Sequence, residues 1–131
     1  MRLLLDTHVA VWAVAAPERL TASVRDLLTA PETLPFVSAA SLWEIAIKHG
    51  LNRGAPGDRP LSALAARAAF EDAGFYWLDI TIAHAAAVER LPRLHGDPFD
   101  RLLLAQAMEE PMRLVTHDQA LAAYGESVIA F

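Results

Sequence analysis

The stretch that decides the fold is the opening one, Arg2-Leu3-Leu4-Leu5-Asp6-Thr7-His8. A short apolar run that ends abruptly in polar residues is typical of a strand buried within a parallel sheet. We therefore predict a strand over residues 2–5, followed by a helix that Thr7 caps. Asp6 then lies at the carboxyl end of the strand, which is the edge where open α/β sheets bind their ligands.

The same alternation of strand and helix continues along the chain. Further strands are predicted over residues 35–37, 75–80, 114–116 and 127–131. Helices are predicted over residues 21–28, 41–49, 61–72, 82–91, 98–109 and 119–124, with a loop over residues 52–60. Strands joined through helices need right-handed crossovers, so the sheet should be mostly parallel and covered on both faces. The predicted fold is a three-layer α/β/α arrangement around a five-stranded sheet.

The composition predicts a single domain over residues 1–131. Hydrophobic residues make up 54% of the 131 residues, which is enough for one substantial core. The chain has no cysteine, and this excludes disulfides, thiolate metal sites and a cysteine nucleophile. Its apolar stretches are too short for a membrane span or a signal peptide, so we expect a soluble, cytoplasmic protein.

Four carboxylates fall at or near the same predicted edge of the sheet: Asp6, Glu44, Asp100 and Asp118. Clustered carboxylates repel one another unless cations neutralise them. Divalent cations that prefer oxygen ligands are the natural partners. The pattern predicts a metal site suited to phosphodiester chemistry. The net charge of −5 does not exclude a phosphate substrate, because bound cations would make this site electropositive.

Helix capping is the competing explanation for these acids. Asp6 and Asp118 stand where N-cap residues are common, and Glu44 completes a Ser-x-x-Glu capping box with Ser41. On the helix that this box would start, Trp43 is expected to face the core. Capping alone would explain each acid singly, whereas their joint placement on one edge favours the metal site.

The segment Asp97-Pro98-Phe99-Asp100 contains two acids with different expected roles. Proline suits the first position of a helix, so Asp97 is the expected N-cap and Asp100 the better metal ligand. Three further residues neighbour the proposed ligands and are candidates to line the site: Thr116, His8 and His117. The sequence has no His-Glu-x-x-His motif, no Gly-x-Gly-x-x-Gly or Walker loop and no Gly-x-Ser-x-Gly elbow. We therefore expect neither a nucleotide cofactor nor a serine nucleophile.

Four segments carry a resemblance to a known family: Leu-Leu-Leu-Asp-Thr-His (3–8), Ser-Leu-Trp-Glu-Ile-Ala-Ile-Lys (41–48), His-Gly-Asp-Pro-Phe-Asp-Arg-Leu-Leu-Leu-Ala-Gln-Ala (95–107) and Leu-Val-Thr-His-Asp (114–118). In this order they resemble the PIN-domain family, with the closest likeness to the VapC-type toxins of bacterial toxin–antitoxin pairs. The resemblance covers nearly the whole chain, although residues 52–61 match no element of the family.

The resemblance implies a doubly wound α/β/α domain with a five-stranded parallel sheet. It also implies a Mg²⁺- or Mn²⁺-dependent ribonuclease, usually homodimeric, that a partner antitoxin inhibits. The acidic residues of the family correspond to Asp6, Glu44, Asp100 and Asp118 in this chain, with Asp97 as an accessory and Thr116 as a small polar residue of the last motif.

The leading hypothesis is therefore RNA hydrolysis at one or two divalent ions, Mg²⁺ or Mn²⁺. Four basic residues are candidates for holding the RNA backbone: Arg101, Lys48, Arg53 and Arg93. The alternative is a non-catalytic, Mg²⁺-binding, receiver-like signalling module, in which Asp79 would accept a phosphoryl group. A phosphatase of the haloacid dehalogenase type would need Asp-x-Asp after the first strand, where this chain has His8 as the third residue.

Overall fold

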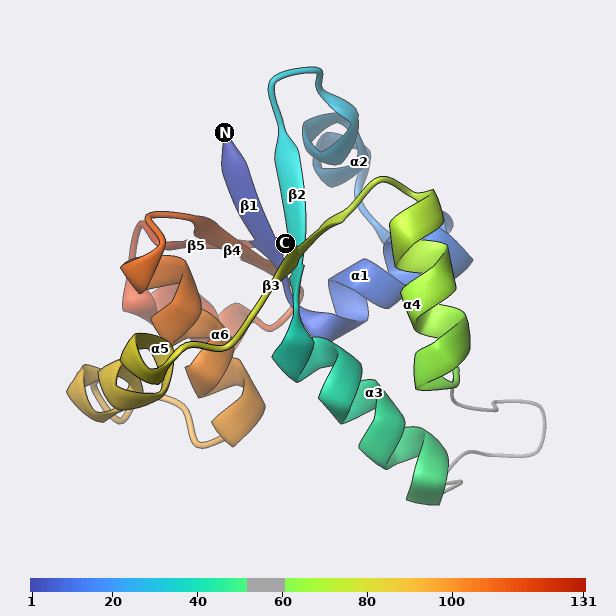
Figure 1. The fold of residues 1–131 in the computed structure, drawn as a ribbon. Helices are drawn as coiled ribbons and strands as arrows, with labels where there is room; N and C mark the ends of the chain where they lie inside the picture. The colour runs from blue at the N-terminus through green and yellow to red at the C-terminus, as the bar shows by residue number, and fades with distance from the viewer. Residues whose placement is uncertain (52–60) are drawn as a thin grey trace.

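A five-stranded parallel sheet forms the centre of the computed structural model, which describes residues 1–51 and 61–131 (Figure 1). The strands are β1 (Arg2–Leu5), β2 (Leu34–Ser38), β3 (Tyr76–Leu78), β4 (Arg113–Thr116) and β5 (Val128–Ala130). They are arranged in the order β3-β2-β1-β4-β5, and every neighbouring pair is parallel. The predicted five-stranded α/β fold is confirmed.

Helices connect the strands: α1 (Thr7–Ala15), α2 (Ala22–Thr29), α3 (Ala39–Leu51), α4 (Ala63–Asp72), α5 (Ile82–Ala87) and α6 (Pro98–Glu109). Three short 3₁₀ segments follow α1, α5 and β4: η1 (Pro17–Arg19), η2 (Val88–Arg90) and η3 (Gln119–Tyr124). Within the part of the chain that the structure describes, no helix is both long enough and apolar enough to cross a membrane.

The helices cover both faces of the sheet and so create two hydrophobic clusters (Figure 1). On one face, Leu4 of β1 packs with Leu104 of α6. On the other face, Leu3 and Leu5 pack with residues of α1, α2 and α4, including Phe70. All three leucines are fully buried, because successive side chains of this central strand point to opposite, covered faces.

The connections between strands reverse direction at β1 and β4, which are neighbours in the sheet. From β1 the chain moves outward through β2 to β3, and it then returns to the other side of β1 as β4. Ligands of open α/β sheets bind at such a point, beyond the carboxyl ends of the strands. Asp6 directly follows β1, and its backbone N–H donates to Val115 of β4 over 3.0 Å. The fold therefore presents Asp6 at the position where a ligand site is expected.

Two predicted helix caps were wrong. The Asp6 carboxylate, and not Thr7, caps α1 by accepting from Val9 N–H. Helix α3 begins at Ala39, directly after β2, and the hydroxyl of Ser38 accepts from Ala40 N–H over 3.0 Å. Ser41 thus lies inside α3, so it forms no capping box with Glu44.

The orientation of α3 also differs from the prediction. Trp43 is 59% exposed and packs edge-on against Phe99 of α6 instead of entering the core. Because α3 starts two residues earlier than expected, its core-facing positions include Ala40 and Ile45. Helix α3 also continues two residues beyond the predicted end at residue 49, so Gly50 lies within it.

Candidate active site

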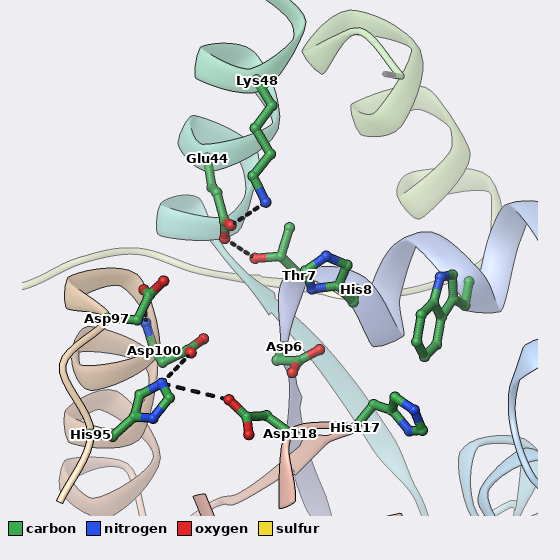
Figure 2. A pocket seen from close by; sticks show the side chains of 11 residues that line it. Asp6, Thr7, His8, Glu44, Lys48, His95, Asp97, Asp100, His117 and Asp118 are labelled. Atoms are coloured by element: carbon green, nitrogen blue, oxygen red, sulfur yellow. Dashed lines mark hydrogen bonds and ion pairs between the residues drawn. The ribbon is translucent and has the colours of Figure 1, made fainter. Parts of the chain in front are cut away.

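A cleft of about 490 Å³ opens at the carboxyl edge of the sheet, where β1, β4, α1, α3 and α6 meet. It is lined by Asp6, Thr7, His8, Trp12, Glu44, Lys48, His95, Asp97, Asp100, His117 and Asp118. Figure 2 shows the carboxylates of Asp6, Glu44, Asp100 and Asp118 arranged around one central space. The structure thus brings together the four acids that the sequence singled out, together with Asp97.

Asp6 is the most deeply buried of these acids, with 5% of its surface exposed. One carboxylate oxygen, Oδ1, accepts from Val9 N–H over 2.9 Å, and the other, Oδ2, accepts from the Thr116 hydroxyl over 2.5 Å. Thr116 in turn accepts from the backbone N–H of Asp118 over 3.0 Å. Burial raises the pKa of Asp6 above its ordinary value, although both hydrogen bonds act in the opposite direction. A charged carboxylate at this position is therefore costly without a cation.

Asp100 and Asp118 meet at His95. The Nε2 atom of His95 lies 2.8 Å from Asp100 Oδ2 and 3.6 Å from Asp118 Oδ2. Burial raises the pKa of Asp100, and the nearby charges of Asp97 and Asp6 act in the same direction. The other oxygen of Asp118 accepts from Ala120 N–H over 3.0 Å and caps η3.

Glu44 is held differently, by a hydroxyl and an ammonium group. Its Oε1 accepts from the Thr7 hydroxyl over 2.6 Å, and its Oε2 lies 2.8 Å from Lys48 Nζ, one helical turn further along α3. The Glu44 side chain is 12% exposed, whereas that of Lys48 is 51% exposed. Lys48 thus carries its positive charge at the open side of the cleft.

Asp97 combines the two roles considered for it. Its Oδ1 accepts from the backbone N–H groups of Phe99 and Asp100 over 2.8 and 3.1 Å, so it is the predicted N-cap of α6. It also lines the cleft. Pro98 occupies the first helical position, as predicted.

Two other predicted basic residues, Arg101 and Arg93, do not line the acidic cleft. Arg101 donates to the carbonyl groups of four residues between Val88 and His95, and also to the Tyr124 hydroxyl. These bonds hold the segment that carries His95. Arg93 is exposed and lines a neighbouring pocket instead of the acidic cleft, while Arg53 lies outside the described residues.

Asp79, on which the receiver-like alternative depended, is not in the acidic cleft. It follows β3, which is an edge strand, and its carbonyl accepts from the buried Gln106 side chain over 3.2 Å. The required grouping of a phospho-acceptor aspartate with the acidic cluster is absent from the described residues, so the receiver-like alternative is wrong.

Sequence reasoning missed two residues that organise the site, Thr7 and His95. Thr7 is the predicted cap of the first helix, but its hydroxyl instead holds Glu44. His95 matched no zinc spacing, yet it stands between two acids. Its position two residues before the cap of α6 could have indicated this role, because a residue there lies at the same edge of the sheet as the first turn of that helix.

The donor set suits a hard divalent cation. Ligand atoms of His95, Asp100 and Asp118 all lie within 4.8 Å of one another, and Asp6 lines the same cleft. Within residues 1–51 and 61–131, no lysine or arginine forms an ion pair with Asp6, Asp100 or Asp118. Carboxylate oxygens are preferred by Mg²⁺, and imidazole is more readily accepted by transition metals. His95 is thus a departure from the all-oxygen site predicted from the sequence.

Comparisons with known proteins agree with this geometry. The model of the PIN domain matches residues 3–127. Ribonuclease VapC22 from Mycobacterium tuberculosis (strain ATCC 25618 / H37Rv) is 35% identical over 123 residues, which span 93% of this chain and 91% of that protein.

Solved structures show the same fold at lower sequence identity. VapBC2 from Rickettsia felis, bound to a DNA fragment from its promoter, matches with a TM-score of 0.68 at 16% identity and covers 100% of this chain and 98% of that one. FitAcB from Neisseria gonorrhoeae matches with a TM-score of 0.64 at 19% identity and covers 97% and 96%.

Proposed function

The chain belongs to the PIN domain family, and from that premise we propose that it is a divalent-metal-dependent endoribonuclease, the toxin of a toxin–antitoxin pair. The observation that carries the proposal is the meeting of Asp6, Asp100 and Asp118 in one cleft without a lysine or arginine partner among the described residues. The 35% identity to a ribonuclease supports RNA as the substrate.

Asp6, Asp100 and Asp118 would hold one or two Mg²⁺ or Mn²⁺ ions, with Glu44 binding directly or through water and Asp97 as an accessory. A bound divalent cation lowers the pKa of its water and neutralises charge on the phosphate undergoing attack. Oxygen ligands favour Mg²⁺ or Mn²⁺ over Zn²⁺.

The neighbouring side chains hold these acids in place. Thr116 and the N–H of Val9 fix both oxygens of Asp6. Thr7 holds Oε1 of Glu44 and Lys48 pairs with Oε2, so this carboxylate is oriented at the cleft, where it can accept a hydrogen bond from an attacking water. Lys48 is also the best-placed cation for an RNA phosphate, because it lines the cleft and is half-exposed.

The proposed partners are an antitoxin protein and a second copy of this chain. A toxin–antitoxin complex from Klebsiella pneumoniae and VapBC2 from Rickettsia felis share the fold, and the first of these supports an antitoxin as a separate partner chain. The second copy of this chain is proposed on the resemblance to the family alone. Cytoplasmic localisation is part of the same proposal, since RNA is the substrate.

Cleavage of RNA by the purified protein tests the proposal. We expect cleavage with Mg²⁺ or Mn²⁺, loss of cleavage in EDTA, and loss in the Asp6→Asn variant. Asp26→Asn is a matched control, because Asp26 is exposed on α2 and does not line the cleft. Equal activity of the wild type and Asp6→Asn, or undiminished activity in EDTA, would contradict the proposed function.

A further inference from the structure

Three rings form an aromatic wall at one end of the acidic cleft: His8, Trp12 and His117. The ring of Trp12 lies 6.0 Å from that of His8 and 5.2 Å from that of His117, centroid to centroid. In Figure 2 the two histidines lie on the opposite side of Asp6 from His95. The wall therefore borders the acids without taking part in their hydrogen bonds.

The indole of Trp12 is fixed from behind. It is partly buried and packs against the cluster of core residues that contains Leu5 and Val9. The guanidinium group of Arg19 lies over the indole, 5.3 Å from its centroid. Phe131 packs against His117 with a centroid distance of 5.1 Å. These contacts make the wall a rigid element, which reduces the entropy that a ligand would lose on binding.

Core packing explains Trp12 but not the two histidines. His8 and His117 are exposed, and neither imidazole forms a hydrogen bond within residues 1–51 and 61–131. Two planar side chains thus stand in a cleft, and the described part of the chain makes no hydrogen bond to their ring nitrogen atoms. Such a pair, held against a fixed indole, is suited to binding another flat group.

The chemistry of the substrate provides that flat group. Single-stranded RNA is recognised largely by stacking its unpaired bases on aromatic side chains, including histidine, and on arginine. His8 is two residues from Asp6 and His117 is adjacent to Asp118 in sequence. A nucleotide whose phosphate lies at the acids therefore has its base within reach of the wall.

We propose that His8, Trp12 and His117 form a stacking site for one nucleobase of single-stranded RNA, next to the phosphate at the acidic cluster. The inference rests on the proposed function and extends it to the form of the substrate. Stacking on this wall requires an unpaired base, so the protein should bind single-stranded RNA more tightly than duplex RNA.

Paired substitutions at His117 separate stacking from hydrogen bonding. His117→Asn removes the ring but keeps polar atoms, whereas His117→Phe keeps the ring and removes the nitrogen atoms. Affinity for a fluorescent single-stranded RNA oligomer is measured by anisotropy with Ca²⁺ in place of Mg²⁺, and cleavage is then measured with Mg²⁺ or Mn²⁺. We expect His117→Asn to weaken binding by about 5- to 150-fold, the range for loss of one stacked base, and His117→Phe to restore it.

Two controls keep the test specific. His49→Asn makes the same chemical change on α3, outside the residues that line the cleft, and should leave affinity unchanged. Thermal unfolding of each variant reports whether the fold survives. His8→Asn and His8→Phe repeat the comparison at a second exposed position, which preserves the test if the His117 variants fold poorly.

RNA oligomers with a single abasic ribose identify the base. Moved along the strand, the abasic site should weaken binding to the wild type at one position next to the cleavage point. At that position the loss should not add to the loss from His117→Asn, because both changes remove the same contact.

The outcomes distinguish this inference from the proposed function. If His117→Phe binds as weakly as His117→Asn, the ring nitrogen atoms matter and stacking is overturned. The same conclusion follows if every variant binds as the wild type does. If the wild type binds RNA with the expected pattern of variants but never cleaves it, the nuclease proposal fails and the stacking site stands.

Discussion

Replacing Asp6 by asparagine should abolish metal binding and RNA cleavage while leaving the metal-free fold nearly intact. Asparagine caps helices about as well as aspartate, so the hydrogen bond from Val9 N–H to the side chain at position 6 should survive. The substitution also removes a buried carboxyl group, whose pKa is raised by its burial. Alanine at the same position should behave very differently, because it offers no acceptor at all.

The magnitudes follow from the two hydrogen bonds of Asp6. In Asp6→Asn, an amide NH2 replaces Oδ2, so the Thr116 hydroxyl can no longer donate there and must turn to accept instead. The loss is about 1 kcal/mol, and removal of the buried charge offsets it. We expect the free energy of unfolding without metal to stay within about 1 kcal/mol of the wild type. Asp6→Ala loses the cap, at about 1 kcal/mol, and leaves buried groups of Val9 and Thr116 unpaired, so the total loss should be about 2–4 kcal/mol.

Urea unfolding at pH 7, in EDTA and again in excess Mn²⁺, measures both effects. At a metal concentration of about 100 times Kd, the wild type should gain about 2.7 kcal/mol, and neither variant should gain a comparable amount. If Asp6→Asn keeps the full stabilisation by Mn²⁺, Asp6 is not a metal ligand. If it is as unstable in EDTA as Asp6→Ala, the capping argument is wrong.

Three further predictions concern pH, the support of Glu44 and the buried polar network. In the folded protein the pKa values of Asp6 and Asp100 are raised above 3.8. Without metal, the contribution of these two groups to the free energy of unfolding should therefore be greatest below pH 3.8 and should decline as the pH rises through the raised pKa values. In EDTA between pH 4 and 7, the free energy of unfolding of the wild type should fall more steeply with pH than that of a variant with asparagine at both positions. Equal pH dependence of the two proteins would contradict this prediction. Thr7→Val removes the hydroxyl that holds Glu44 and also contacts the buried Ser41 hydroxyl. It should lower kcat on RNA by about 10- to 100-fold and cost about 1 kcal/mol in urea unfolding; an unchanged kcat would show that the contact with Glu44 is dispensable. Gln106→Leu removes the acceptor of the fully buried Ser38 hydroxyl and the side-chain donor to the Asp79 carbonyl. It should cost about 2–4 kcal/mol in urea unfolding, whereas a loss below about 1 kcal/mol would mean that water or a rotamer change satisfies these groups.

The strands and most helices could be predicted because each carries a local signal. Strand β1 carries leucine on both of its faces, and this marks a strand that is covered on both sides. Pro98 and Asp97 mark the start of α6 with two independent features. These signals act within a few residues, so no knowledge of the rest of the chain was needed to use them.

The caps of α1 and α3 and the role of His95 could not be predicted, because contacts between distant parts of the chain determine them. The pairing of Asp6 N–H with Val115 carries the extended backbone one residue past β1, and this makes Asp6 the cap and places Thr7 inside α1. His95 reaches Asp100 and Asp118 because Arg101 holds the preceding segment through several carbonyl groups. Neither arrangement is visible from local sequence, since both depend on residues that meet only in the folded protein.

Capping and metal binding are not alternatives for these acids, because the same carboxylate can do both. Asp6, Asp97 and Asp118 each use Oδ1 to accept from the first turn of the helix that follows. A carboxylate has two oxygens with about four acceptor positions, so the cap occupies one oxygen and fixes the rotamer. The second oxygen of Asp6 then meets Thr116 and that of Asp118 meets His95, both at the cleft. A strand that ends in a capping aspartate therefore supplies an oriented ligand without further support. One acid at such a position is poor evidence for a metal site, because capping alone explains it, whereas acids at the ends of neighbouring strands are strong evidence.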